Sequence, residues 1–249
     1  MNPEEFANIE RCEREFWWFR GMEQILFQLL TPVAAKRGAL RAVEAGCGTG
    51  HMASRFEEQY GWRVFPTDLQ PQGLVYGQRH GVKRMAQADV CALPFPDAGF
   101  DVALCLDVIA HLPRGEEHKA VQELARVLAP GGLLVMRTSA LDILRSNHSA
   151  FTIERQRFTR ARFMKLAADH GIKVLRCTYV NSLLMPVALT KFRVMEPLLR
   201  SRVSSGVQPV ADWLNRLLLG VLRLEAKWLA SGHGFPLGQS LVLIGERCV

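Results

Sequence analysis

The sequence lacks the cysteine spacing that would indicate a zinc site or a disulfide framework. It has six cysteines, and none belongs to a Cys-x-x-Cys pair. Most lie inside apolar stretches such as residues 103–106. Six reduced thiols in a cytoplasmic protein, with no metal site, is the simplest prediction. The cysteines are Cys12, Cys47, Cys91, Cys105, Cys177 and Cys248.

Long apolar runs are also scarce. The first twenty residues hold eight acidic or basic side chains, so no secretory signal peptide is expected there. The longest charge-free stretch of the second half, residues 177–190, is too short to span a bilayer and contains Pro186. We therefore expect a soluble intracellular protein without a transmembrane segment.

No repeat and no low-complexity segment interrupts the 249 residues, of which 49% are hydrophobic and 22% charged. This composition excludes disordered and fibrous proteins. The net charge is +7, but residues 1–136 carry −3 and residues 137–249 carry +10. A basic half can attract nucleic acid, a membrane surface or an anionic substrate, although a solvated basic face is the simpler interpretation.

Short apolar runs alternate with helical patterns from residue 40 onward, which predicts a mainly parallel sheet covered on both faces. A helical N-terminus, broken near Gly21, precedes them. The expected strands are residues 40–45, 62–66, 84–88, 100–106, 133–138, 172–180 and 240–246, and the expected helices are residues 51–60, 71–79, 116–128, 160–170 and 186–231.

A glycine-rich segment follows the first expected strand and opens a helix. It reads Glu-Ala-Gly-Cys-Gly-Thr-Gly from Glu44 to Gly50. A nicotinamide fingerprint would need glycine where His51 stands, and the Gly-Lys-Ser/Thr of a phosphate-binding loop is absent. An acid directly before the glycines disfavours a pyrophosphate and suits a cationic ligand such as a sulfonium.

These residues resemble the first motif of class I S-adenosylmethionine-dependent methyltransferases. Four later segments are similar to the later motifs of that family and come in the same order. They are residues 64–69, which contain Asp68, residues 88–90, residues 100–111, and residues 128–135. The segment Glu-Phe-Trp-Trp-Phe-Arg at residues 15–20 resembles the N-terminus of a large bacterial subgroup of these enzymes, whose later elements recur here with substitutions at Gln156, Phe158 and Leu237.

The resemblance implies a Rossmann-like α/β fold with seven mostly parallel strands and an antiparallel last strand. It implies a single methyltransferase domain over residues 1–249: an N-terminal helical lid (1–38), a cofactor-binding core (39–180), a helical insertion (181–238) and the last strand (239–249). S-adenosylmethionine is the implied cofactor. Its implied binding residues are Trp18, Arg20, Glu44, Gly46, Cys47, Gly48, Gly50, Asp68, Leu69, Asp89, Val90, Leu106 and Asp107.

Two residues are candidates for catalysis. His111 follows the fourth strand and has a side chain suited to general base chemistry, but a lone histidine before Pro113 could equally be structural. Arg157, in a basic run, could hold an anionic acceptor through a two-pronged contact. The same run could be a solvated helix face.

The absence of an Asn/Asp-Pro-Pro-Tyr/Phe signature favours a small-molecule, glycan or lipid-like acceptor over nucleic acid or protein. Two alternatives stay open: a non-catalytic S-adenosylmethionine-binding scaffold, and an RNA methyltransferase that uses the basic half. The acceptor, the methylated atom and the oligomeric state are not specified by the sequence.

Residues 209–231 predict an amphipathic helix. One stripe contains Trp213, Leu217 and Trp228, and a second, polar stripe contains Arg216 and Arg223. We expect the Trp-rich stripe to pack against the domain; the alternatives are a substrate wall or a membrane-surface contact.

Overall fold

A computed structural model describes residues 2–199 and 202–248 of the chain. Seven strands within this part form one sheet in the order β3-β2-β1-β4-β5-β7-β6. The strands are β1 (Arg41–Ala45), β2 (Arg63–Asp68), β3 (Ala86–Gln87), β4 (Phe100–Leu106), β5 (Leu128–Ser139), β6 (Ile172–Val180) and β7 (Ser240–Arg247).

The sheet has the predicted seven-stranded Rossmann-like α/β architecture. Neighbouring strands from β3 to β5 are parallel, whereas β7 runs antiparallel to both β5 and β6. The third strand is shorter than expected, and the fifth begins earlier because Leu128 already pairs with Phe100. This confirms the fold class.

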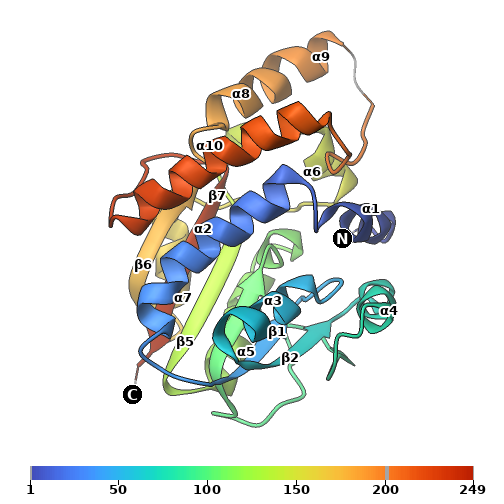
Figure 1. The fold of residues 1–249 in the computed structure, drawn as a ribbon. Helices are drawn as coiled ribbons and strands as arrows, with labels where there is room; N and C mark the ends of the chain where they lie inside the picture. The colour runs from blue at the N-terminus through green and yellow to red at the C-terminus, as the bar shows by residue number, and fades with distance from the viewer. Residues whose placement is uncertain (1, 200–201, 249) are drawn as a thin grey trace.

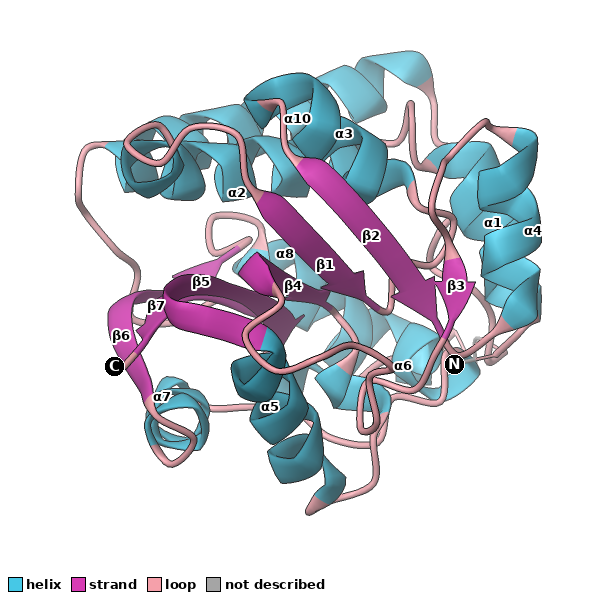
Figure 2. Cartoon of the chain, turned by 90° about the horizontal axis from the view of Figure 1, so that it is seen from below, coloured by secondary structure: helices cyan, strands magenta, loops and turns pink. Residues whose placement is uncertain are grey.

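Helices cover both faces of the sheet (Figure 1 and Figure 2). On one face α2, α3 and α10 share a core with the sheet, and on the other α5 and α7 do so. The α-helices are α1 (Glu4–Cys12), α2 (Trp17–Ala34), α3 (His51–Tyr60), α4 (Pro71–Arg79), α5 (Glu116–Val127), α6 (Asn147–Phe151), α7 (Arg160–Ala168), α8 (Met185–Thr190), α9 (Glu196–Leu198) and α10 (Asp212–Ala230). The shorter turns are the 3₁₀ helices η1 (Ile109–His111) and η2 (Asp142–Leu144) and the π-helix η3 (Lys191–Met195).

The N-terminal helices break between residues 12 and 17, and not near Gly21 as expected. Gly21 lies inside α2, where a Cβ would come within 2.2 Å of the Leu222 side chain of α10. The glycine therefore permits close packing of two helices that are about two hundred residues apart in the chain.

Helix α10 packs through a different face from the one predicted. Trp213, Leu217 and Trp228 are exposed, by 63%, 57% and 47%, so the expectation that they pack the domain is wrong. The helix is buried through the opposite stripe, which is also apolar. That stripe contains Leu219, Leu222, Ala226 and Leu229.

The predicted continuous helix over residues 186–231 is divided in two. Residues 185–198 form α8, η3 and α9, and residues 202–211, which precede α10, have no regular structure. The described helices include none that is both long and apolar enough to cross a membrane.

Candidate active site

The loop between β1 and α3 has an unusual backbone conformation. Gly46, Gly48 and Gly50 have left-handed φ angles of 81°, 56° and 74°. The Gly46 N–H donates to the Thr67 carbonyl at 2.7 Å, which ties the loop to the end of β2. A Cβ on Gly46 would lie 2.1 Å from the Val108 side chain, so no larger residue fits there. A ligand can thus approach the backbone at the start of α3.

Glu44 lies on β1 just before this loop and is 2% exposed. Its Oε2 has no hydrogen-bond partner among the described residues. Burial, and then the nearby Asp68 carboxylate, raise the pKa of Glu44 to about 8. The backbone N–H of Ala53 hydrogen-bonds to the group and opposes this rise. A buried carboxyl group with one free oxygen is stabilised by a cationic ligand, which would lower its pKa.

Asp68 ends β2 beside the glycine loop. Its Oδ2 accepts from the Gly48 N–H and its Oδ1 from the Gln70 N–H, both at 2.8 Å. Burial raises the pKa of Asp68, and these two hydrogen bonds oppose the rise. Each carboxylate oxygen keeps a second lone pair for a ligand hydroxyl. Leu69, the next residue, is exposed.

The third segment of the family resemblance, residues 88–90, follows β3, the edge strand that pairs with β2. Asp89 is exposed, and its Oδ1 accepts from the Cys91 N–H at 2.8 Å. Val90 is buried in the core beneath. Asp89 therefore caps a turn whose outer surface is open to a ligand. Cys47 is buried within the glycine loop, and burial raises the pKa of its thiol.

The ends of β4 and β5 are joined by an ion pair that sequence analysis missed. Arg137, 7% exposed, lies on β5 and its Nη2 contacts the Asp107 Oδ2 at 2.6 Å. Its guanidinium also lies 5.3 Å from the ring centroid of Trp18 in α2. Asp107 follows the buried Leu106 and has a left-handed φ of 61°. A lone basic residue in an otherwise apolar run is the signal that could have revealed Arg137.

His111 ends η1, directly after β4. Burial lowers the pKa of His111, so the ring is neutral near pH 7. Its Nδ1 lies 3.4 Å from the Ile153 carbonyl, which can only accept, so that Nε2 is left to take up a proton. The Gln156 amide holds the turn by donating to the Ile109 and Leu112 carbonyls.

Arg157 is committed to contacts within the protein. Its Nε donates to Glu154 at 2.5 Å, its Nη1 to the Ala140 carbonyl and its Nη2 to the Ser149 hydroxyl. Its side chain is only 9% exposed. The structure therefore contradicts our interpretation that Arg157 holds an acceptor, because every guanidinium nitrogen is engaged in packing a loop.

The N-terminal helices lie over the glycine loop. Phe6 of α1 is buried, and its ring would be 3.8 Å from a Cβ on Gly48. Glu13 follows α1 and accepts from the Thr49 hydroxyl at 2.5 Å, while burial raises the pKa of this carboxyl group. The loop is thus covered by a segment far from it in the sequence.

Arg20 lies in the first turn of α2 and is half-buried. Three residues later, on the same side of the helix, Glu23 contacts His51 and Arg55 of α3. The Arg20 guanidinium makes no hydrogen bond or ion pair with any residue that the structure describes.

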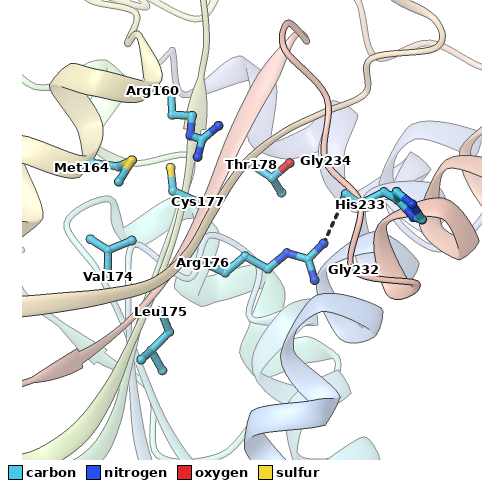
Figure 3. Close-up of a pocket in the computed structure, with 10 residues that line it drawn as sticks. All are labelled: Arg160, Met164, Val174, Leu175, Arg176, Cys177, Thr178, Gly232, His233 and Gly234. Atoms are coloured by element: carbon cyan, nitrogen blue, oxygen red, sulfur yellow. Dashed lines mark hydrogen bonds between the residues drawn. The ribbon is translucent and has the colours of Figure 1, made fainter.

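An open groove of about 370 Å³ lies elsewhere, along the outer strand β6 (Figure 3). Arg160, Cys177 and Thr178 line it together with the turn at residues 232–234. Arg176 is fixed there by donating to the carbonyls of Leu229 and His233. The groove includes none of the predicted cofactor residues, so we separate it from the site at the strand ends.

Comparison with known proteins assigns the core. Residues 43–136 match the family model described as a methyltransferase domain. The malonyl-[acyl-carrier protein] O-methyltransferase of Pectobacterium atrosepticum is 29% identical over 245 residues, which are 95% of this chain and 88% of that protein. The Mycobacterium tuberculosis protein named "Probable S-adenosylmethionine-dependent methyltransferase" is 34% identical over 131 residues, 52% of this chain.

The family model and these relatives support a class I S-adenosylmethionine-dependent methyltransferase. The chain spans 45% of the length of the M. tuberculosis relative. Its fold is similar to that of a geranyl diphosphate methyltransferase in complex with S-adenosylmethionine, with a TM-score of 0.59 and 17% identity over 92% of this chain and 85% of that one.

The site fits this family at the carboxyl edge of the sheet. The glycine loop follows β1, Asp68 ends β2 and Asp107 follows β4. Because these strands are parallel, their carboxyl ends lie together, at the point between β1 and β4 where the strand order in the sheet reverses. The unpartnered Glu44 oxygen and the unpaired Arg20 match a ligand that carries both positive charge and a carboxylate. The described residues contain no cluster of three or more potential metal ligands.

Proposed function

We propose that this chain transfers the methyl group of S-adenosylmethionine to a small-molecule, glycan or lipid-like acceptor. The observation that carries the proposal is the buried Glu44 carboxyl group, unpartnered at Oε2 and placed directly before a left-handed glycine loop. Such a group has no favourable role in an apolar interior without a cation.

In this proposal the chain's own residues hold the cofactor by its different parts. Asp68 accepts hydrogen bonds from the ribose hydroxyls, and Asp89 and Val90 lie beside the adenine. Glu44 balances the positive charge of the sulfonium. Arg20 pairs with the cofactor carboxylate, and Trp18 and Leu106 border the methionine end. Asp107, fixed by Arg137, presents its free Oδ1 and backbone there. The glycine loop supplies close backbone approach.

S-adenosylmethionine, when bound, supplies an electrophilic methyl carbon whose bond to sulfur breaks as the acceptor's lone pair attacks, leaving a neutral thioether. His111 takes the proton that a hydroxyl acceptor must lose, at Nε2. The neutral state of the ring before reaction suits this role. The N-terminal helices act as a lid that excludes water and holds the reactants in line.

The names of the relatives favour a small acceptor over RNA. Besides the malonyl-[acyl-carrier protein] enzyme, they include the demethylmenaquinone methyltransferase of Thermus thermophilus, 34% identical over 110 residues. We propose a small or lipid-like acceptor of this kind.

The test is methyl transfer from radiolabelled S-adenosylmethionine to a panel of malonyl-acyl carrier protein, demethylmenaquinone, bacterial lipid extract and total transfer RNA. We expect transfer to a small or lipid-like acceptor, and His111→Asn should lower kcat by about 10²–10⁴-fold with cofactor affinity unchanged. Tight cofactor binding without any transfer would instead favour the scaffold alternative. Salt-sensitive transfer to RNA alone would favour the RNA alternative.

A further inference from the structure

Exposed apolar side chains are concentrated in one part of the molecule. Twelve of the seventeen large hydrophobic residues that are exposed in the described chain fall within residues 181–238. We call this set the outer helical surface. It comprises Leu183, Val187, Val194, Met195, Leu198, Leu199, Val203, Trp213, Leu217, Leu224, Trp228 and Leu237.

The segment formed by α8, η3 and α9 contributes no core. None of the residues in these three elements is buried, although most are apolar. The segment starts beside α10, where the buried Glu225 accepts from the Ser182 and Leu183 N–H groups. From there it extends along the outside of the molecule (Figure 1). An apolar helix without buried residues is expected to find a partner surface.

Helix α10 carries two apolar stripes, and only one meets the protein core. Trp213, Leu217, Leu224 and Trp228 form the other stripe, on the solvent side. The two tryptophans are fifteen residues apart, which corresponds to ~22 Å along the axis. Tryptophan at the ends of an exposed apolar stripe is typical of helices that lie in the interface of a bilayer.

The exposed charges around these stripes are mostly positive. Six cations are exposed on residues 181–238 of the described chain, and none of them forms an ion pair there. Three occupy one flank of the α10 stripe: Arg216, Arg223 and Lys227. Among the acids, Glu225 is buried and Glu196 accepts from the Asn147 N–H, which leaves Asp212 as the fully exposed acid of this described region. The surface is therefore apolar and basic together.

We propose that the outer helical surface docks on a bilayer that contains anionic lipid. The tryptophan and leucine side chains enter the interface, and the flanking cations meet lipid phosphates. A second copy of the chain fits less well, because a two-fold contact would place like charges against one another. The proposal is independent of methyl transfer, since docking requires neither cofactor nor acceptor.

The test is co-sedimentation of the full chain with vesicles of phosphatidylcholine, with and without phosphatidylglycerol. We expect binding that needs the anionic lipid and weakens with salt. The triple variant Trp213→Ser, Leu217→Ser, Trp228→Ser should lose binding at least about tenfold, because three exposed apolar groups no longer enter the interface. Its melting temperature should stay close to that of the wild type.

Charge variants form the matched control. Arg216→Gln, Arg223→Gln and Lys227→Gln together should weaken binding to anionic vesicles by roughly fivefold for each cation. Equal charge removal at Lys36, Lys83 and Arg114, which lie outside the surface, should change binding far less. Equal losses in the two sets would overturn the proposal.

Two further results would also overturn it. The first is that the wild-type protein stays in the supernatant when anionic vesicles are sedimented, because a membrane-docking surface would carry it into the pellet. A wild-type dimer that the serine triple variant converts to monomer, without vesicle binding, would show that a second copy covers these helices. Because vesicle binding is read without cofactor, its failure leaves the methyl transfer experiment to be judged separately.

Discussion

The carboxyl edge of the sheet and the helices between β6 and β7 use charge in opposite ways. At the edge lie three acids, Glu44, Asp68 and Asp107, on or beside buried strands. Backbone N–H groups hydrogen-bond to the first two, and Arg137 forms an ion pair with the third. On the outer helical surface, cations surround apolar side chains and have no acidic partners among the described residues. The first arrangement suits a small cationic ligand, and the second suits an extended anionic surface.

The largest expected effect separates the two stripes of α10. Leu222 is fully buried against α2, so Leu222→Ala should lower the free energy of unfolding by about 2–5 kcal/mol. Leu224, two residues away, is 62% exposed, and Leu224→Ala should change it by no more than about 0.5 kcal/mol. Urea unfolding of both variants measures the difference. Similar losses would mean that the outer stripe also supports the core.

The second prediction concerns the acid at the strand end. The pKa of Glu44 is about 8 in the folded chain against 4.5 as its ordinary value, so the folded state holds a proton that the unfolded state releases. Stability should therefore fall as pH rises from 4.5 to 8. Glu44→Gln removes this loss and should stabilise the cofactor-free protein by about 3 kcal/mol at neutral pH.

Thermal unfolding across this pH range, with the exposed Glu4→Gln as control, measures the Glu44 effect. In the same variant S-adenosylmethionine should bind more weakly, because no carboxylate balances its charge. A variant that is stabilised and still binds the cofactor with wild-type affinity would remove Glu44 from the site.

A smaller effect is expected at the neighbouring carboxylate. Asp68→Ala should weaken S-adenosylmethionine binding by about 1.5–3 kcal/mol, because a charged hydrogen-bond acceptor is lost. Asp68→Asn keeps an acceptor for the Gly48 N–H, so it distinguishes ligand contact from loop support. Calorimetry measures both, with the exposed Asp97→Ala as control. Unchanged affinity in the alanine variant would contradict the assignment.

The smallest effect concerns the contact between α10 and the start of α2. Asn215 of α10 accepts from the Trp17 N–H at 2.8 Å and donates to the Glu15 carbonyl at 2.9 Å, so it caps the start of α2. Asn215→Ala should cost roughly 1 kcal/mol of stability. Hydrogen exchange should show faster opening of residues 13–20, whereas Gln72→Ala on α4 should leave that segment unchanged. Unaltered exchange would show that the helices are held by packing alone.

The residues at the carboxyl edge could be predicted because each lies at the end of a strand, and the local sequence pattern reveals where a strand ends. Each motif stands at a strand end, and parallel pairing brings the ends together without further information. The face by which α10 packs could not be predicted in this way. Both of its stripes are apolar, and the choice depends on a contact between Gly21 and Leu222, which lie far apart in the chain.

Arg157 and Arg137 show the same limit for charges. The basic run around Arg157 looked available for a ligand, yet Glu154 and two loop groups occupy it once the loop folds. Arg137 was hidden in a strand pattern, although its ion pair fixes the end of β4. Which charges are free depends on tertiary neighbours that periodicity does not reveal.

The position of β7 in the sheet has a consequence for the order of assembly. It lies between β5 and β6, although both of those strands, and all of α8 to α10, are synthesised before it. Until residues 240–247 leave the ribosome, β6 has no strand to pair with and β5 has an open edge. Translation therefore passes through a stage in which an unfinished sheet and the exposed apolar side chains of α8 to α10 are present together, a combination that favours aggregation.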